Sequence, residues 1–383
     1  MSTETSVTNV AVIDPSLFSL PYDVHLCGGL AAAGLKTTLF ARTPRTGEKI
    51  SGKDFIFEPW FYSNSERWRN SSLLPKAVTN ALKAAEHGVD SLRLAYHLRR
   101  KKVAAAHFQW IALPAIDRFT VKFLKRAGIP VVMTVHDTVP FNASPSSKGQ
   151  NLGWQSTLEL FDALIVHTQQ SKTNLEAMEI KVPVFIVPHG LLSFGPAPTV
   201  EKRSGKLTFL FFGSIKPYKG VDILLRAFQK ANASRTAELL IVGNCAEGPG
   251  EIECLIKELA IEDCVRFECR FFDDADVPAI LAQGDVLVFP YRRIDGSGAL
   301  LTALAYAKPV IATDVGMFRE LLRDPEALVA ANSVDALAEN LTGLIQDRSR
   351  LETLRAVALR SAEKIPSWTQ IGTTTAKVYA SLR

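Results

Sequence analysis

The stretch from Leu287 to Val315 holds a small-residue turn, Gly296-Ser297-Gly298, between an apolar strand and a helix. A turn of this kind leaves free backbone N–H groups at the positive end of the helix dipole, where anions bind. Arg292 and Arg293 would add positive charge nearby. The turn therefore predicts a phosphate site. A tight strand-to-helix connection without a ligand fits the same residues and stays open.

Two lysines, Lys216 and Lys219, lie between an expected strand at 207–212 and an expected helix at 221–230. A lysine in that position can meet a phosphate held at the helix N-terminus. If both turns share one end of a sheet, the lysines and the glycine-rich turn would together stabilise a leaving diphosphate. The alternative is a basic loop on the surface.

Histidines end several expected strands in the first half of the chain. His136 follows an apolar strand and could orient a substrate hydroxyl, donate to a departing phosphate, or act as acid or base. His107, His167 and His189 are placed similarly, which suggests a polar lining without selecting one catalytic residue. Asp295 could accept hydrogen bonds from hydroxyls or simply cap the following turn. A structural role for each of these residues stays open.

The whole chain limits the protein class. Its 383 residues predict about two domains, and 47% hydrophobic with 22% charged residues indicates a globular core. We find no apolar run of the roughly 18 residues needed to cross a bilayer, and no signal peptide. The dinucleotide pattern Gly-x-Gly-x-x-Gly and the Walker pattern are both missing. Five cysteines without metal-ligand spacing favour a reducing cytoplasm over a disulfide framework or a zinc site.

The segment from Trp60 to Arg126 is strongly basic, with 13 basic and 4 acidic residues. The window also carries aromatic side chains and the run 99–102, which is entirely basic. Basic residues mixed with aromatics suit an anionic membrane surface or a phosphate-bearing partner. A solvated basic face is the alternative. We find no nucleic-acid-binding signature.

Strands and helices alternate in two series, which predicts an α/β protein with two doubly wound, Rossmann-like domains facing a central cleft. We expect a first domain at 1–190, a linker at 191–206 and a second domain at 207–365. Residues 43–75 and 142–151 are predicted to be irregular. The expected strands are 10–14, 37–41, 103–110, 130–135, 163–167, 183–187, 207–212, 238–242, 265–268, 285–289 and 310–313.

With these pieces placed, the chain resembles the family-four retaining glycosyltransferases of the GT-B fold over nearly its full length. The resemblance implies a donor sugar held by the second domain, an acceptor held by the first, and no required metal or cofactor. It also implies that residues 366–383 form a helix that crosses back to the first domain. The matching stretches are Thr134 to Asp137, Phe211 to Gly213, Tyr218 to Gly220, Ile241 to Gly243, Asp295 to Gly298 and Lys308 to Gly316.

The family's functional residues carry over by position. Lys219 matches the lysine on the donor diphosphate, and Lys216 substitutes for a second basic residue. Asp295 stands where the first of two paired glutamates contacts the donor sugar. The second glutamate, which holds the ribose, is missing, and Thr302 is its candidate replacement. The expected catalytic residues are His136, Lys219 and Asp295, and the expected donor-binding residues are Gly213, Lys216, Lys219, Gly243, Arg270, Asp295, Ser297, Gly298, Ala299, Leu300 and Thr302.

These expectations add up to a hexosyltransferase that uses a nucleoside diphosphate sugar and retains the anomeric configuration. Its acceptor would be lipid-linked or an oligosaccharide in bacterial polysaccharide or glycolipid assembly. We expect a cytoplasmic protein that contacts the inner membrane through residues 60–126. Another GT-B activity, such as a nucleotide-sugar epimerase or a phosphorylase, is one alternative. A non-catalytic partner subunit is the other, because the second glutamate is missing.

Overall fold

A computed structural model describes residues 8–52, 54–68, 75–138, 153–198, 205–231, 236–245 and 247–383. The chain divides into two compact units. Unit 1 combines residues 1–190 with Pro366–Arg383, and unit 2 spans Leu191–Ile365. The expected loop at 142–151 lies outside the described residues.

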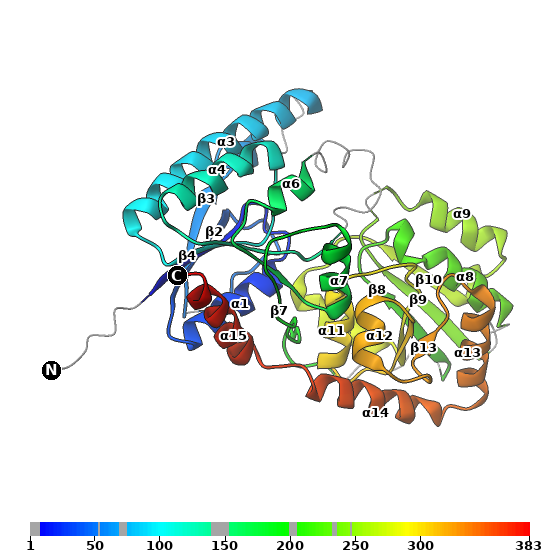
Figure 1. Ribbon diagram of the computed structural model, residues 1–383. Coiled ribbons are helices and arrows are strands. Elements are labelled where there is room, and N and C mark those ends of the chain that lie inside the picture. The colour runs from blue at the N-terminus through cyan, green and yellow to red at the C-terminus, as the bar shows by residue number, and fades with distance from the viewer. Residues whose placement is uncertain are drawn as a thin grey trace. The chain divides into compact units, whose positions relative to one another are not determined.

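Unit 1 is built on a parallel sheet with the strand order β3-β2-β1-β4-β5-β6-β7 (Figure 1). Its strands are β1 (Asn9–Asp14), β2 (Lys36–Arg42), β3 (Ile56–Phe61), β4 (Ala105–Phe108), β5 (Val131–Thr134), β6 (Ala163–Val166) and β7 (Val184–Ile186). Its helices are α1 (Leu20–Ala32), α2 (Ser65–Trp68), α3 (Lys76–Lys101), α4 (Pro114–Arg126), α6 (Trp154–Leu158), α7 (Gln169–Ala177) and α15 (Trp368–Ser381).

The inner strands of this sheet are buried on both faces, as their apolar runs predict. Because side chains alternate along a strand, Ala11 and Ile13 of β1 pack with α3 and α4 on one face. Val10 and Val12 face the other way, into a second cluster with residues of α1 and α15. Figure 1 shows α3 and α4 together, and α1 beside α15. Unit 1 is therefore a three-layer α/β structure.

Strand β3 corrects the expectation that residues 43–75 are irregular. It pairs in parallel with β2 at the edge of the sheet. Its residues alternate poorly: Ile56 is 42% exposed and Glu58 is also exposed, whereas Phe61 is buried. An edge strand with a solvent-exposed face lacks the continuous apolar run by which the inner strands are recognised.

Helix α15 returns to unit 1 and packs closely on α1. Its first turn is closed by a capping box between Ser367 and Gln370. A Cβ atom at Gly29 would lie 2.1 Å from the carbonyl oxygen of Trp368, and one at Gly372 would lie 2.1 Å from the carbonyl oxygen of Gly29. The two backbones touch because both contact positions are glycine.

This contact predicts opposite effects for two neighbouring glycines of α1. Gly29→Ala should destabilise unit 1 by roughly 1–3 kcal/mol, because the new methyl group overpacks against Trp368. Gly28→Ala meets nothing within 4 Å and should stabilise the helix by about 0.5–1 kcal/mol. Urea unfolding of both variants measures this. Equal effects would show that α1 and α15 do not pack so closely.

Unit 2 has a second parallel sheet, in the order β10-β9-β8-β11-β12-β13. Its strands are β8 (Leu207–Phe212), β9 (Ala237–Gly243), β10 (Val265–Cys269), β11 (Val286–Phe289), β12 (Val310–Thr313) and β13 (Leu328–Val329). Its helices are η2 (Pro217–Lys219), α8 (Val221–Lys230), α9 (Gly250–Glu258), η4 (Glu262–Cys264), η5 (Asp274–Asp276), α10 (Val277–Gln283), α11 (Gly298–Ala305), α12 (Gly316–Leu322), α13 (Val334–Gln346) and α14 (Arg350–Glu363). Among the described residues, no helix is long and apolar enough to cross a membrane.

Candidate active site

The turns that follow β8 and β11 meet at Gly213, where the sequence predicts a phosphate site. Gly213 has a φ of +130°, a conformation that favours glycine. A Cβ atom there would lie 3.3 Å from the Lys219 Nζ and 3.9 Å from the Cβ of Ala299. The Lys219 ammonium and the first turn of α11 therefore lie on the same side of unit 2, around one glycine.

Backbone contacts hold these two turns together. A Cβ at Gly220, which has a φ of +66°, would lie 2.1 Å from the carbonyl oxygen of Pro290. The amide of Arg292 donates to the carbonyl oxygen of Tyr218 at 2.7 Å. The Arg292 guanidinium forms a bidentate pair with Asp222, at 2.9 and 2.7 Å. Arg292 was expected to supply charge to an anion, but it instead ties the two turns to each other.

Lys219 and Lys216 differ in their surroundings. Lys219 is only 9% exposed, and its Nζ lies 5.2 Å from the ring centroid of Tyr291, a cation–π distance. Lys216 precedes the short helix η2 and is exposed. Packing therefore fixes the position of the Lys219 ammonium and leaves Lys216 free to adjust. A preorganised cation stabilises developing negative charge better than a mobile one.

The Gly-Ser-Gly turn is a capped helix start. The Ser297 Oγ accepts from the amide of Leu300 at 3.2 Å, so this amide, expected to face a phosphate, is already used. Thr302 is 3% exposed and its hydroxyl donates to the carbonyl oxygen of Gly298 at 2.8 Å, and its contact with the ribose stays a prediction. Within the described part of the chain, no acceptor contacts the amides of Gly298 and Ala299. These two donors remain for an anion.

Gly243 ends β9 and Arg270 directly follows β10, along the same edge of the sheet. A Cβ at Gly243 would lie 1.9 Å from the carbonyl oxygen of Gly213, so these two strand ends touch. The amide of Arg270 donates to the Gly243 carbonyl oxygen at 3.1 Å. Its guanidinium carbon lies 3.7 Å from the ring centroid of Phe272. Asp295, in the loop before α11, is partly exposed. The expected donor-binding residues thus lie along one edge of unit 2.

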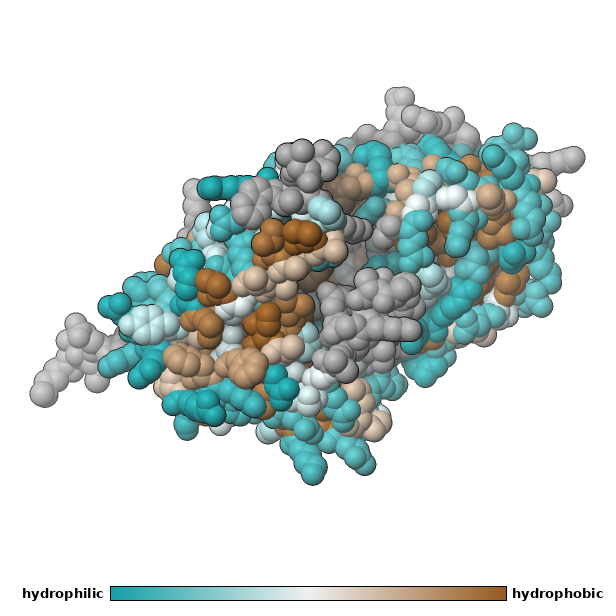
Figure 2. All heavy atoms as spheres, turned by 90° about the horizontal axis from the view of Figure 1, so that it is seen from above, coloured by the Kyte–Doolittle hydropathy of each residue, from teal (hydrophilic) through white to brown (hydrophobic). Residues whose placement is uncertain are grey.

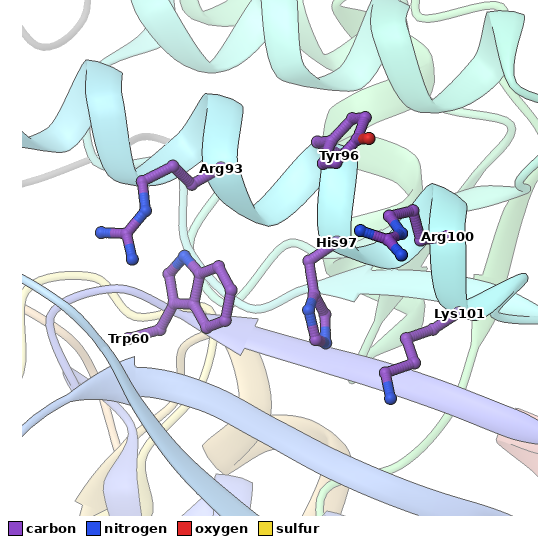
Figure 3. Close-up of a pocket in the computed structure, with 6 residues that line it drawn as sticks. All are labelled: Trp60, Arg93, Tyr96, His97, Arg100 and Lys101. Carbon is purple, nitrogen blue, oxygen red and sulfur yellow. The ribbon is translucent and has the colours of Figure 1, made fainter.

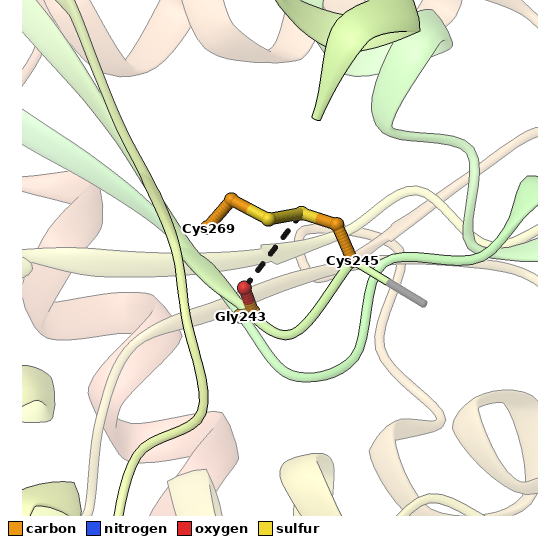
Figure 4. Close-up of a disulfide and its surroundings, with 3 residues drawn as sticks. All are labelled: Gly243, Cys245 and Cys269. Carbon is orange, nitrogen blue, oxygen red and sulfur yellow. Dashed lines mark hydrogen bonds between the residues drawn. A yellow bond between two sulfur atoms is a disulfide. The ribbon is translucent and has the colours of Figure 1, made fainter. Parts of the chain in front are cut away.

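A disulfide joins Cys245 and Cys269 at this edge, against the expectation that the cysteines stay reduced (Figure 4). Their Cα atoms lie 5.8 Å apart, and the Cys245 sulfur lies 3.9 Å from the carbonyl oxygen of Gly243. The pair is separated by 24 residues in sequence. The two cysteines lie close together because the strand register places Cys269 opposite Gly243 on the neighbouring parallel strand. A cysteine count carries no such information.

Unit 1 gathers histidines at or just beyond the carboxyl ends of its strands β4 to β7. The His107 Nδ1 lies 2.6 Å from the hydroxyl of Tyr379, and its Nε2 lies 2.7 Å from that of Thr134. Burial lowers the pKa of His107 to about 3, that of His167 to about 4 and that of His189 to about 3. These imidazoles are therefore neutral at physiological pH.

His136 is the expected catalytic histidine in this group. Its ring stacks on Trp110 with centroids 5.1 Å apart, and Tyr22 approaches it edge-on at 4.9 Å. Burial, and then the neighbouring imidazoles, hold its pKa well below the usual value. A neutral imidazole is a poor general acid. His136 is therefore suited to orienting a substrate by hydrogen bonding.

The tautomers in this group follow from their partners. The His167 Nδ1 lies 2.9 Å from the carbonyl oxygen of Val187, so it carries the proton and its Nε2 accepts. That Nε2 lies 3.3 Å from the His136 Nδ1, which must donate, so the His136 Nε2 accepts. The Gln109 amide lies 3.1 Å from this Nε2, with its oxygen nearest, and its buried nitrogen has no hydrogen-bond partner among the residues that the structure describes. Turning the amide over replaces the contact between two acceptors with a hydrogen bond from the Gln109 nitrogen.

We therefore expect Gln109 to set the protonation of His136. Gln109→Glu places a carboxylate against the His136 Nε2 and should raise the pKa of this histidine by about one unit or more, since charged hydrogen bonds contribute about 1.5–3 kcal/mol. Gln109→Met has a similar size and no charge, and should leave the histidine neutral. Nitrogen NMR of the imidazoles measures both. An unchanged His136 titration in Gln109→Glu would remove Gln109 from this role.

Sequence reasoning missed a buried acidic pair beside this group. Asp14 ends β1 and Asp23 lies in α1, and both are 0% exposed. Ser19 contacts both, at 3.5 Å to the Asp14 Oδ2 and 3.2 Å to the Asp23 Oδ1. Burial, and then the Asp14 charge, raises the pKa of Asp23 well above its usual value. Burial also raises the pKa of Asp14, so both carboxyls favour the protonated form. Aspartates on a strand and on the next helix give no sequence signal of this kind.

In the part of the chain that the structure describes, no three His, Cys, Asp or Glu side chains are arranged so that they could bind a metal ion.

Two family models match the chain. Residues 24–191 match "Glycosyltransferase Family 4", and residues 206–347 match "Glycosyl transferases group 1". D-inositol 3-phosphate glycosyltransferase of Kineococcus radiotolerans is 27% identical over 66% of this chain and 66% of its own length. GDP-mannose:glycolipid 4-beta-D-mannosyltransferase of Xanthomonas campestris is 24% identical over 74% of this chain and 78% of its own. The chain thus spans just under two thirds of the length of the first of these relatives.

Solved structures share the fold. Sucrose-phosphate synthase of Thermosynechococcus elongatus superposes with a TM-score of 0.70 at 18% identity, over 98% of this chain and 99% of that one. HepE of Anabaena, solved with UDP-glucose, gives 0.71 at 16% identity, over 97% and 99%. The two sheets and these neighbours define the GT-B fold. With both family matches, the chain belongs to the family-four type of glycosyltransferases.

Proposed function

We propose that this glycosyltransferase moves a hexose from a nucleoside diphosphate sugar to a lipid-linked or oligosaccharide acceptor, with retention at the anomeric carbon. The observation that carries the proposal is the meeting of Lys219 and the α11 turn at Gly213. A buried ammonium, and two amides that contact no acceptor among the described residues, offer a diphosphate charge neutralisation and directed hydrogen bonds. Departure of the nucleoside diphosphate is the step that such a site would accelerate.

The roles of the other residues follow from the site. Lys216 would close over the diphosphate from its exposed position, and Asp295 would accept hydrogen bonds from the donor sugar. Gly243 and Arg270 would line the nucleotide side of the edge. His136, neutral and held by its neighbours, would orient a sugar hydroxyl. The proposal requires no metal ion and no cofactor.

The acceptor class draws support from the relatives. Their names include a GDP-mannose:glycolipid mannosyltransferase and a phosphatidyl-myo-inositol mannosyltransferase of Mycolicibacterium smegmatis. We place this chain in bacterial glycolipid or polysaccharide assembly on the cytoplasmic face of the inner membrane. Residues 60–126 would make the peripheral contact with the bilayer.

Thermal-shift measurements with uridine, guanosine and adenosine diphosphate sugars test the donor. One nucleotide series should raise the unfolding temperature, because a ligand that binds only the folded state stabilises it by mass action. The shift should shrink in Lys219→Ala. If none of the nucleotides raises the unfolding temperature, the donor assignment is wrong.

Two rival functions predict different products. An epimerase interconverts nucleotide sugars without any acceptor, whereas a transferase releases nucleoside diphosphate faster when acceptor is present. A partner subunit without activity, favoured by the missing second glutamate, would release none. Chromatography of the reaction with and without a glycolipid acceptor separates the three cases.

A further inference from the structure

One face of α3 carries apolar side chains that stay exposed among the described residues of unit 1. They recur every three, four or seven residues, which places them on one side of the helix. The exposed apolar residues of α3 are Val78 at 42%, Leu82 at 41%, Val89 at 57%, Leu92 at 60% and Tyr96 at 56%. Phe119 of the neighbouring α4 is 64% exposed. Figure 2, which looks down on this face, shows hydrophobic side chains gathered over these helices with hydrophilic ones around them.

A pocket of about 550 Å³ lies at the C-terminal end of this face. It is lined by Trp60, Arg93, Tyr96, His97, Arg100 and Lys101. Figure 3 shows the Trp60 indole and the His97 ring below α3, with Arg93 at one end and Lys101 at the other. Helix α3 supplies five of the six side chains, at spacings that keep them on adjoining turns. The apolar face therefore ends in an aromatic pocket with cations around it.

Positive charge dominates the pocket. The Arg93 guanidinium lies 3.5 Å from Asp90 and stays 65% exposed, so this ion pair is weak. Burial, and then the charge of Lys101, lowers the pKa of His97, against the opposing effect of Glu58. Arg100 lowers it further. The three cations of the lining, Arg93, Arg100 and Lys101, give the pocket the positive charge that attracts an anion.

The pocket is separate from the candidate active site of unit 1. His97 and Lys101 also line an adjoining pocket of about 180 Å³. That pocket reaches Asn9 and Lys36, which are the first residues of β1 and β2. The histidine group of the active site lies at the opposite, carboxyl ends of the strands. A ligand here would not occupy the place of the substrates that unit 1 binds at those ends.

We propose that this face of unit 1 docks on an anionic lipid bilayer, with one lipid phosphate held between Arg93, Arg100 and Lys101. The exposed apolar residues of α3 enter the boundary between headgroups and acyl chains. Trp60 and Tyr96 lie at that boundary, where amphipathic aromatic rings are favoured. The joint presence of an apolar stripe and a cationic pocket favours a lipid over a free phosphate ion, which would need only the cations.

Sedimentation of the full chain with phospholipid vesicles tests the proposal. Vesicles that contain phosphatidylglycerol should bind the protein, less so as salt rises, and vesicles of phosphatidylcholine alone should bind it far less. The triple variant Arg93→Ala, Arg100→Ala, Lys101→Ala should lose on the order of 100-fold in affinity. The control Lys257→Ala, Arg355→Ala, Lys364→Ala removes the same charge from exposed positions of unit 2 and should bind normally. Equal losses in both variants, or equal binding to both vesicles, would overturn the proposal.

A second variant separates the lipid from a free anion. Leu92→Ser changes an exposed residue, so it should keep the unfolding temperature while weakening vesicle binding. Inorganic phosphate alone is the probe for a soluble ligand. One result would contradict the lipid proposal. It is that phosphate stabilises the protein, that this stabilisation requires Arg93, Arg100 and Lys101, and that Leu92→Ser leaves vesicle binding unchanged. The pocket would then bind a free phosphate ion.

Membrane docking rests on the proposed function in one respect, since a lipid-linked acceptor gives the protein a reason to bind the bilayer. The docking proposal and the transferase proposal can nevertheless be tested separately. Thermal shifts by nucleotide sugars should be the same in the triple variant and the wild-type protein. Vesicle binding without any donor shift would overturn the transferase proposal and leave the membrane site standing.

Discussion

Replacing Lys219 by alanine should reduce turnover by roughly 30- to 1,000-fold, which corresponds to about 2–4 kcal/mol of transition-state stabilisation. The ammonium is buried and lies beside Gly213 and the first turn of α11, so water cannot readily replace it. Release of nucleoside diphosphate from the donor that gives the largest thermal shift measures the rate.

A size-matched variant separates charge from packing. Lys219→Met keeps most of the side-chain volume over Tyr291 but loses the charge, so its turnover should fall about as far as that of Lys219→Ala. Its unfolding temperature should stay closer to that of the wild-type protein. Near-normal turnover in Lys219→Met would remove the charge from the mechanism and leave Lys219 a structural role.

Acid should destabilise unit 1 strongly between about pH 6.5 and pH 5.5. His107, His136, His167 and His189 have folded-state pKa values below the unfolded value of 6.5. The unfolded chain therefore binds more protons, and stability is lost as the pH falls through this window. Each histidine contributes about 1 kcal/mol over this unit of pH, or about 4 kcal/mol for the group.

The buried aspartates oppose this effect. The folded-state pKa of Asp23 is raised above 3.8, so its protonation stabilises the fold as the pH falls. The pKa of Asp14 is raised by burial as well, so the two carboxyls together offset at most about 2.7 kcal/mol per pH unit and the histidines still dominate. Tryptophan fluorescence follows unit 1 alone, because all 5 tryptophans belong to it. His189→Phe should reduce the histidine contribution by about a quarter. Equal stability at both pH values would contradict the neutral histidine group.

The sequence predicts the inner strands well because burial on both faces demands short apolar runs. The turn after β11 and the lysines after β8 were found because small residues and cations at strand ends have a local signature. Their meeting at Gly213 follows from the strand order β9-β8-β11, which the spacing of residues along the chain does not contain.

Pairings between distant segments could not be predicted. Arg292 lies 70 residues from Asp222, and nothing near it in sequence shows that its charge is used there. The Cys245–Cys269 disulfide depends on the register of two strands. His136 could not be distinguished from the other strand-end histidines, because Gln109 and Trp110 reach it from a neighbouring strand end.

Unit 1 is built from two segments of the chain that are synthesised before and after unit 2. Unit 2 is continuous, whereas unit 1 needs its last helix from Pro366–Arg383. Until residues 366–383 have been synthesised, α15 cannot cover the surface of α1 around Gly29 or the apolar side chains that pack against it. Domains usually fold in the order in which they emerge. Here we expect the later half to finish first, so a stalled or truncated chain would present the nascent amino-terminal half to chaperones and proteases.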